Sequence, residues 1–364
     1  MKHTLLIVGE ELHINEPFKR YIISSYEAHF GEATSFYLQS KSDKNLPFMI
    51  EEIIGLNDSL VIYAGDDSFA TVAKILATLG DDELLLNGDL LAPSKSEVVT
   101  KNGALLKIGE CEINLILARP AQKLGAILGS ARKDFAYFSL FDIDSESANI
   151  LLTPLAKTYE VELTSSELIP NWVLIRARAG KFGQIASFFE GVQNLFSNKM
   201  IPYKNEVEFI TSVLMQKGLK ITFAESCTAG LLSARFGDIA GVSEVFDGSL
   251  ITYSNQLKHS WLGVGDEVLK SYGAVSEPCV QEMLKGALAR SGADFALAVS
   301  GIAGPGGGTS QKPVGTVYVG AASSKGGVLV ERLLLAGDRE YVRTQSVTAC
   351  IACLLRLAPD VFFA

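Results

Sequence analysis

The sequence predicts an α/β protein that contains more than one domain. The chain has 364 residues, of which 48% are hydrophobic and 20% are charged, and this is enough for two or three domains with their own cores. In the first and last segments, short apolar strand-like stretches alternate with stretches of helical periodicity. This order is typical of a parallel sheet with crossover helices. Between these segments the pattern changes, and a smaller α+β module is predicted.

The first segment, residues 1–135, is predicted to open with a buried strand. Its expected strands are residues 4–8, 59–63 and 114–118, and its expected helices are residues 47–56 and 69–79. The apolar stretch at the N-terminus is short and acidic residues follow it, so we expect no signal peptide. No apolar run approaches the ~18–20 residues that cross a bilayer. We therefore expect a cytoplasmic protein with no membrane partner.

The middle module is predicted at residues 136–202. We expect helices at residues 148–160 and 185–195, and strands at residues 160–163 and 172–177. The stretch Met200-Ile201-Pro202-Tyr203 is expected to form a linker, because proline disfavours the helical conformation in the residue before it.

The last segment, residues 203–364, has the clearest pattern. Its expected strands are residues 220–224, 245–252, 295–300 and 314–321. Its expected helices are residues 206–217, closed by Gly218, then 226–236, then 276–291 with Pro278 in the first turn, and finally 339–357.

Composition excludes several classes of function. The net charge of −9 repels nucleic-acid backbones, and no dense Lys/Arg stripe reverses it, so no nucleic-acid partner is expected. The five cysteines are scattered, which favours reduced thiols in the cytoplasm. Cys350 and Cys353 form a C-x-x-C pattern inside an apolar helical stretch, where we expect packing rather than redox chemistry. His259 is the one histidine of the last segment, which argues against a zinc site and weakens a Ser-His-Asp triad there.

A candidate nucleophile lies at Ser226, in the stretch Thr222 to Gly230. A strand runs here into a tight polar turn and then into a helix, so Ser226 is expected at the helix N-terminus, where free N–H groups favour negative charge. This geometry can cap the helix, and it can also hold an oxyanion or a phosphate. Cys227 is a rival nucleophile, although a cysteine just inside a helix more often packs.

A candidate base lies at Lys258, in a polar cluster after the next strand. A serine hydroxyl needs a base, and where histidine is nearly absent a lysine with a lowered pKa can replace it. Tyr253, in the same cluster, can relay or position the proton. The alternative is that Lys258 is a solvated surface charge.

Two further segments have the chemistry of ligand binding. The glycines of residues 300–309 allow backbone amides to approach a ligand closely, at the end of a strand where α/β sheets bind ligands. The pattern is neither a P-loop nor a dinucleotide fingerprint, and a merely flexible loop is the alternative. Arg339 and Arg343 share one helix face and can clamp a carboxylate or phosphate, or else form ordinary ion pairs with Asp338 or Glu340.

These segments, in this order, resemble the C-terminal domain of the CinA family, which also occurs alone as PncC. The family patterns A-E-S-C-T-G-G, Y-S-N-x-x-K, G-A-V-S-E-P, S-G-I-A-G-P-x-G-G, K-P-V-G-T-V and G-D-R-x-x-V-R correspond to residues 224–230, 253–258, 273–278, 300–308, 312–317 and 337–343. Ala229 stands where the first pattern usually has glycine.

The resemblance implies hydrolysis of nicotinamide mononucleotide to nicotinate mononucleotide and ammonia, a step of pyridine nucleotide salvage. It implies Ser226 as nucleophile, Lys258 as base and Tyr253 as an assisting residue, an acyl-enzyme intermediate, no metal and a homodimer. The glycine-rich loop and the arginines would hold the ribose phosphate. The expected substrate-binding residues are Thr228, Gly230, Ser254, Asn255, Gly301, Gly304, Gly306, Gly307, Arg339 and Arg343.

The first segment resembles the other CinA domain, which has a molybdopterin-biosynthesis-like fold and is associated with ADP-ribose pyrophosphatase activity, and the middle module resembles the family's small KH-like domain. The family pattern G-G-L-G-P-T-x-D-D corresponds here to residues 64–72, which have lost glycines and gained Asp66 and Asp67. We predict that the fold is kept, that the pyrophosphatase chemistry is lost and that no divalent metal binds.

Three alternatives remain open at this stage. The protein is a bifunctional enzyme in which Asp66 and Asp67 recruit a metal, a competence-associated scaffold without catalysis, or a regulatory protein that binds nicotinamide nucleotides without turning them over.

Overall fold

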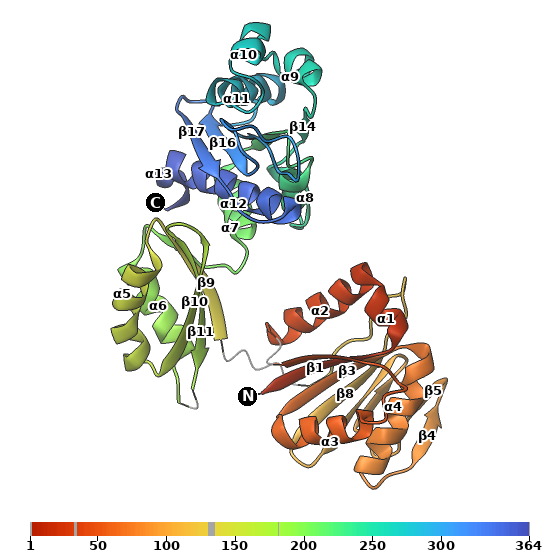
Figure 1. The fold of residues 1–364 in the computed structure, drawn as a ribbon. Helices are drawn as coiled ribbons and strands as arrows, with labels where there is room; N and C mark the ends of the chain where they lie inside the picture. Colours follow the sequence, from red (N-terminus) through yellow and green to blue (C-terminus); the bar gives the residue numbers. More distant parts are fainter. Residues whose placement is uncertain (1, 33–34, 130–134, 181, 364) are drawn as a thin grey trace. The chain divides into compact units, whose positions relative to one another are not determined.

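The computed structural model describes residues 2–32, 35–129, 135–180 and 182–363 (Figure 1). The chain divides into two compact units, Met1–Phe135 and Ala136–Ala364, which are described separately below. The mixed α/β class predicted from the sequence is confirmed, and the two units together contain several sheets. None of the helices that the structure describes combines the length and the apolar character that a bilayer-spanning helix requires.

The first unit is built on a six-stranded sheet of order β2-β1-β3-β8-β7-β6. The strands β2, β1, β3 and β8 run parallel, and β7 and β6 are antiparallel additions at one edge. The bounds are β1 (His3–Val8), β2 (Ser35–Gln39), β3 (Ser59–Ala64), β6 (Val98–Thr100), β7 (Gly103–Ile108) and β8 (Cys111–Leu117), with a separate hairpin of β4 (Leu84–Asn87) and β5 (Leu90–Pro93). The expected strands at 4–8, 59–63 and 114–118 are therefore confirmed, within a few residues at their ends.

Helices cover both faces of this sheet, because successive side chains of a strand point to opposite sides. In β1, Leu5 and Ile7 join the core beneath α2 (Glu16–Phe30), which follows the short helix α1 (Glu10–Ile14). Leu6 and Val8 join the core on the other face, beneath α3 (Leu46–Leu56) and α4 (Asp66–Leu79). The first unit is thus three layers deep.

The second unit begins with a four-stranded sheet of order β10-β11-β9-β12, packed against two helices. Its elements are β9 (Phe135–Phe141), α5 (Ser145–Thr158), β10 (Val161–Ile169), β11 (Trp172–Ala179), α6 (Ile185–Leu195) and β12 (Met200–Ile201). The linker expected at residues 200–203 is wrong at its start, because Met200 and Ile201 are buried and pair antiparallel with β9. The strand β9 was not expected, and its pairing with the distant β11 and β12 explains why local periodicity missed it.

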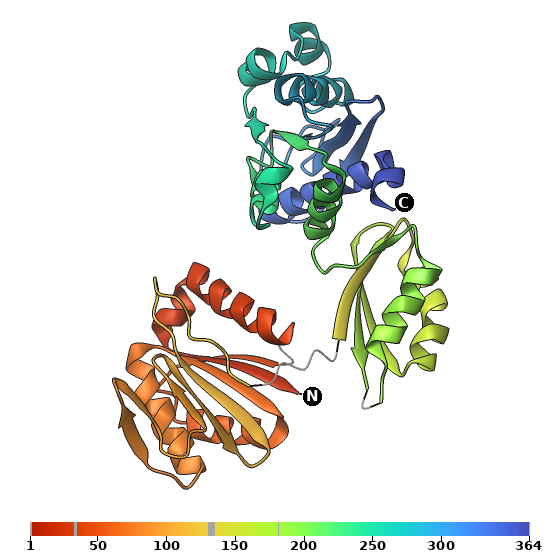
Figure 2. The ribbon, with the colours of Figure 1, turned by 180° about the vertical axis from the view of Figure 1, so that it is seen from behind.

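The rest of the second unit is a five-stranded sheet of order β14-β13-β15-β16-β17 with helices on both faces (Figures 1 and 2). The strands are β13 (Ile221–Glu225), β14 (Ser249–Ile251), β15 (Phe295–Gly301), β16 (Thr316–Ser323) and β17 (Val328–Leu334). The helices are α7 (Glu206–Lys217), α8 (Leu231–Gly237), η1 (Val242–Glu244), α9 (Asn255–Leu262), α10 (Asp266–Ser271), α11 (Glu277–Ser291), α12 (Arg339–Leu357) and α13 (Pro359–Phe362).

The two faces of this sheet carry different helices. Phe223, Leu297 and Val299 lie in the core that contains α7, α8 and the buried side of α12. Ala224, Ala296 and Ala298 alternate with them and lie in the core that contains α9 and α11. Small side chains on the second face let α11 approach the strands closely. The free cysteines Cys350 and Cys353 are buried in α12, as the packing interpretation predicted.

Two expected boundaries in this region are wrong. The helix expected from Ser226 begins only at Leu231, because Ala229 and Gly230 have φ angles of 50° and 91°, which a right-handed helix does not allow. The strand expected at residues 245–252 is reduced to β14. By contrast, Gly218 ends α7 in the left-handed conformation, as expected.

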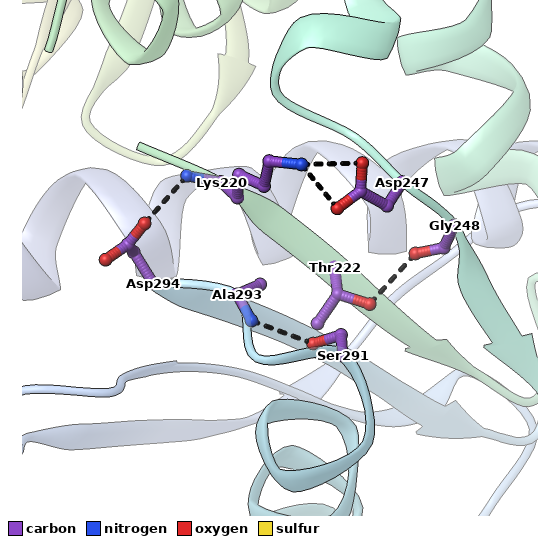
Figure 3. A network of polar contacts seen from close by, with 7 residues as sticks. All are labelled: Lys220, Thr222, Asp247, Gly248, Ser291, Ala293 and Asp294. Atoms are coloured by element: carbon purple, nitrogen blue, oxygen red, sulfur yellow. Dashed lines mark hydrogen bonds and ion pairs between the residues drawn. The ribbon is translucent and has the colours of Figure 1, made fainter. Parts of the chain in front are cut away.

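Polar contacts fasten the beginnings of the three parallel strands β13, β14 and β15 (Figure 3). The Lys220 backbone N–H donates to Asp294 over 2.9 Å, and its ammonium group pairs with Asp247 at 2.6 Å. The Thr222 hydroxyl donates to the carbonyl of Gly248 over 2.9 Å. The ion pair is half exposed, so it contributes only about 0.2–1 kcal/mol, and the contacts mainly fix which strand ends lie side by side.

Candidate active site

The candidate site lies where the parallel strands of the C-terminal sheet end. β13, β14 and β15 run in the same direction, so the segments that follow them meet at one edge of the sheet. β17 is antiparallel to β16, which is antiparallel to β15, so the segment from β17 to α12 reaches the same edge. The fold therefore brings together Ser226, Lys258, the glycine-rich loop and Arg339.

The central contact joins Ser226 and Lys258. The Lys258 Nζ atom lies 2.9 Å from the Ser226 hydroxyl, 2.7 Å from the carbonyl oxygen of Thr252 and 3.4 Å from that of Tyr253. Lys258 is only 1% exposed, so the surface-charge alternative for this residue is wrong. An ammonium group donates to all three oxygens, whereas an uncharged amine, with two N–H bonds and one lone pair, donates to the two carbonyls and accepts from the hydroxyl.

The surroundings of Lys258 shift its protonation equilibrium toward the uncharged amine. Burial lowers the pKa of Lys258 from its ordinary value of 10.5, because the ammonium form loses its hydration. Burial raises the pKa of the neighbouring Cys227 thiol to about 11, so that this rival nucleophile stays protonated at neutral pH. The base in this site is thus paired with the serine rather than with the cysteine.

Ser226 does not cap the following helix. The carboxylate of Glu225 accepts hydrogen bonds from the backbone N–H groups of Gly230, Leu232 and Ser233, which are the donors that a helix start leaves free. The Ser226 hydroxyl is left for Lys258. Glu225 is a site residue that the sequence interpretation missed, and the available signal was an acidic residue at the end of an otherwise apolar strand.

A cavity of about 280 Å³ opens beside the pair. Its wall contains the predicted residues Ser226, Tyr253, Lys258, Gly301, Gly304, Gly306, Gly307 and Arg339. It also contains residues that were not proposed as binding residues, namely Cys227, Ala274, Val275, Ser300, Ile302 and Ala303. The buried Ser300 hydroxyl donates to the carbonyl of Ala274 over 2.8 Å, which ties the segment before α11 to the glycine-rich loop.

The two arginines of α12 have different surroundings. Arg339 is exposed at the cavity and donates to the carbonyl of Gly304 over 2.7 Å and to the Tyr253 hydroxyl over 3.0 Å. Arg343 donates to the carbonyl of Thr228 over 2.6 Å and does not line the cavity. Arg339 is therefore the arginine that an anionic ligand in the cavity can reach.

Comparison with known proteins decides the family. The family model described as the CinA C-terminal domain matches residues 204–358. Over 147 residues, the chain is 50% identical to the nicotinamide-nucleotide amidohydrolase PncC of Enterobacter agglomerans, and the match covers 40% of the chain and 90% of that protein. Over 287 residues, it is 32% identical to the CinA-like protein of Thermosipho melanesiensis, covering 72% of the chain and 68% of that protein.

The chain belongs to the CinA family. Its similarity to PncC is confined to the C-terminal part, called the CinA domain below. The chain is also 38% identical over 208 residues to the CinA-like protein of Dictyoglomus turgidum, covering 56% of the chain and 48% of that protein. The chain thus matches about half the length of this relative.

Besides Arg343, four residues expected to bind the substrate do not line the cavity of the CinA domain. Thr228 is fully buried within the turn of residues 226–230, called the nucleophile turn below, and the Gly230 N–H donates to Glu225. The Ser254 hydroxyl accepts from the N–H of Leu257 and so caps α9, which begins at the exposed Asn255. Substrate contact by these four residues stays a prediction.

The first unit of this CinA protein has acidic side chains at the carboxyl ends of its parallel strands. Asp66 pairs with Arg119 at 2.7 Å, and Asp67 lies 3.5 Å from the ammonium group of Lys41. The Glu11 side chain packs against Gly65, where an added Cβ would lie 1.6 Å from a Glu11 oxygen. In the described part of the chain, no three His, Cys, Asp or Glu residues form a cluster that could hold a metal ion.

Proposed function

We propose that the CinA domain hydrolyses the carboxamide of nicotinamide mononucleotide to give nicotinate mononucleotide and ammonia. The observation that carries this proposal is the buried Ser226–Lys258 pair, with 2.9 Å between the hydroxyl oxygen and Nζ, at the wall of a cavity. The 50% identity to a nicotinamide-nucleotide amidohydrolase over the same part of the chain supports the choice of substrate.

In the first half-reaction, uncharged Lys258 takes the proton of Ser226 while the serine oxygen attacks the carboxamide carbon. The carbonyl oxygen becomes an oxyanion, and the backbone N–H of Cys227, which has no acceptor in any other described residue, can stabilise it. Protonated Lys258 then gives its proton to the departing nitrogen. The C–N bond breaks, ammonia leaves, and Ser226 carries the nicotinoyl ester.

In the second half-reaction, Lys258 takes a proton from water, and the hydroxide oxygen attacks the ester carbonyl. The ester C–O bond breaks, Lys258 returns the proton to Ser226, and the carboxylic acid product leaves. The overall reaction consumes one water and releases one ammonia. Every proton transfer passes through Lys258, and no step requires a metal.

Arg339 is the residue that we propose to bind the phosphate group. Its guanidinium lies at the cavity wall, and an arginine can contact a phosphate with two parallel hydrogen bonds. The glycine-rich loop supplies backbone close to the same place. Arg343 acts indirectly, because it holds the carbonyl of Thr228 within the nucleophile turn. Tyr253 supports both ends of the site, with its hydroxyl on Arg339 and its carbonyl on Lys258.

The first experiment measures ammonia release from nicotinamide mononucleotide with a chelator present. Wild type is compared with Ser226→Ala and Lys258→Ala, which should each lower kcat by about a thousandfold or more. Lys270→Ala is the matched control, because its side chain is 72% exposed and is not part of the cavity wall, and it should keep wild-type activity. No turnover by folded wild type would refute the proposal and favour a binding or scaffold role.

A second experiment separates the two arginines. Arg339→Ala should raise KM by about ten- to a hundredfold with a smaller change in kcat, since a charged hydrogen-bond pair to the phosphate is lost in substrate and transition state alike. Arg343→Ala should lower kcat instead, because it loosens the turn that holds Ser226. The reverse pattern would assign the phosphate to Arg343.

A further inference from the structure

Glu225 has an environment that a strand residue rarely has. It is the last residue of β13, immediately before Ser226, and its side chain is 0% exposed. A buried carboxylate is stable only when donors replace its lost hydration. The hydrogen bonds to Glu225 therefore decide whether its burial is tolerated.

Among the residues that the structure describes, the hydrogen bonds to this carboxylate come from the N-cap and the first turn of α8. The N–H groups of Gly230 and Leu232 donate to one oxygen over 3.0 Å and 3.1 Å. The N–H of Ser233 donates to the other oxygen over 2.9 Å, and the Ser233 hydroxyl donates to the same oxygen. The negative charge also lies at the positive end of the helix dipole. Glu225 is thus the cap of a helix that starts after the nucleophile turn.

Because Glu225 caps α8 from the preceding strand, the residues of the nucleophile turn do not have to cap the helix. In an ordinary start, the side chain of the N-cap residue accepts the free N–H groups. The N-cap of α8 is Gly230, which has no side chain. Here Glu225 takes those donors and the Ser226 hydroxyl bonds to Lys258, while the N–H of Cys227 has no acceptor in any other residue that the structure describes. The turn also needs support, because Ala229 lies at a φ of 50°, which is costly for a residue with a Cβ.

Glu225 is also connected to the base. Its backbone carbonyl accepts from the N–H of Thr252 over 2.8 Å, and the carbonyl of Thr252 accepts from Lys258 Nζ over 2.7 Å. On the side-chain path, the Ser233 hydroxyl lies 2.6 Å from that of Ser249 in β14, the strand that leads to Lys258. One residue therefore sets the positions of the serine turn and of the segment that carries the lysine.

We propose that Glu225 is a positioning residue for the nucleophile: its carboxylate caps α8 in place of a side chain at the N-cap Gly230, and this arrangement holds the Ser226 hydroxyl against Lys258 and keeps the Cys227 amide available for the oxyanion. The proposal rests on Ser226 being the nucleophile of the proposed function, but it does not depend on the identity of the substrate. Glu225 touches neither substrate nor reacting atoms.

The experiment measures the rate at which a small fluorophosphonate labels Ser226, detected by intact-protein mass. In this reaction the serine oxygen forms a bond to phosphorus, the P–F bond breaks, fluoride leaves, and Lys258 receives the serine proton. The rate reports nucleophile activation without nicotinamide mononucleotide. Ammonia release from that nucleotide is measured in parallel, and the thermal unfolding midpoint gives the folded fraction.

Glu225→Gln keeps the shape but replaces one acceptor oxygen with an NH₂ donor, so at least one N–H of the first turn loses its partner. Labelling and kcat should both fall about a hundredfold per folded protein, with KM changed by about twofold at most. The pH midpoint of labelling should not move, because Lys258 sets it. Glu208→Gln is the matched control: this glutamate of α7 is exposed and does not line the cavity, so the variant should stay within about threefold of wild type.

Labelling of Glu225→Gln at the wild-type rate, or a shifted pH midpoint, would overturn the proposal. If Glu225→Gln does not fold, Glu225→Asp is used to test the proposal, because it keeps the negative charge on a shorter side chain. Labelling of Glu225→Asp that is about tenfold slower than wild type supports the proposal, and labelling at the wild-type rate refutes it. Wild type that is labelled but releases no ammonia would refute the proposed function and leave the inference standing. Wild type that is not labelled at all would refute both.

Discussion

The Arg339 guanidinium donates a hydrogen bond to the hydroxyl of Tyr253 over 3.0 Å, while the contact of Tyr253 with Lys258 is made by its backbone carbonyl. The phenol ring therefore faces the arginine rather than the base. This separates two roles for Tyr253, proton relay and positioning, which the sequence could not distinguish.

We expect Tyr253→Phe to raise KM for nicotinamide mononucleotide by about three- to tenfold and to change kcat little, because the substitution loosens Arg339 by one hydrogen bond. A tyrosine that relayed the proton would instead lose about a hundredfold or more in kcat. Steady-state kinetics distinguish the two. Tyr272→Phe is the control, since this tyrosine is also exposed and does not line the cavity.

The pH dependence of activity should report Lys258. Catalysis needs the uncharged amine, and burial lowers its pKa, so kcat/KM should rise with pH to a plateau whose midpoint lies below the ordinary lysine value of 10.5. The neighbouring thiols of Cys227 and Cys279 have pKa values of about 11 each, so they stay neutral through this rise.

Two variants check the assignment of this midpoint. Lys258→Arg should be inactive across the range, because a guanidinium stays protonated. His259→Gln should keep the wild-type midpoint, since His259 is half exposed and contacts the carbonyl of Val264. A midpoint that moves in His259→Gln would identify histidine as the base.

Lys258 should also make stability depend on pH. Its pKa is lower in the folded state than in the unfolded chain, so between the two values the unfolded chain binds more protons and the folded state gains stability as pH rises. Lys258→Met lacks this group. The free energy of unfolding of wild type, measured relative to Lys258→Met by urea titration, should therefore increase as the pH rises toward the ordinary lysine value of 10.5. A constant difference would mean that Lys258 titrates alike in both states.

Ala229 should be a stabilisation site. At a φ of 50° its Cβ is strained by roughly 1–2 kcal/mol, and glycine removes this strain at an entropy cost of about 0.5–1 kcal/mol in the unfolded chain. Ala229→Gly should therefore raise the free energy of unfolding by about 0.5–1 kcal/mol and leave kcat unchanged. Ala234→Gly, at an exposed position inside α8, should instead lower stability by about 1 kcal/mol. Similar effects of the two glycines would refute the strain argument.

The first unit is expected not to cleave ADP-ribose. Asp66 and Asp67 are paired with basic side chains, and Glu11 packs against Gly65, so acidic groups lie where a pyrophosphate would have to bind. The full chain, given ADP-ribose with Mg²⁺ or Mn²⁺, should release no ribose 5-phosphate. Metal-dependent release that Asp66→Asn and Asp67→Asn abolish would instead establish the bifunctional alternative.

Many helices and strands of the second unit could be predicted from local sequence, because a few neighbouring residues are enough to indicate them. The apolar stretch of β15, the Gly218 cap of α7 and the helix Arg339–Leu357 follow from periodicity and turn chemistry. β9, β12 and the true start of α8 could not be predicted this way. Each depends on partners far along the chain or on the φ angles of Ala229 and Gly230.

The sequence by itself determined which residue types are available to the site: a serine after a buried strand, a lysine in place of histidine, a glycine-rich loop and two arginines on one helix face. Only the tertiary structure decided their environments. In the folded protein, Lys258 is buried against Ser226, and Glu225 caps α8. Arg339 lines the cavity, whereas Arg343 binds the carbonyl of Thr228 and does not line it. The physical reason is that pKa, hydrogen-bond partners and access depend on what packs around a group, and the edge of a parallel sheet assembles those neighbours from segments far apart in the chain.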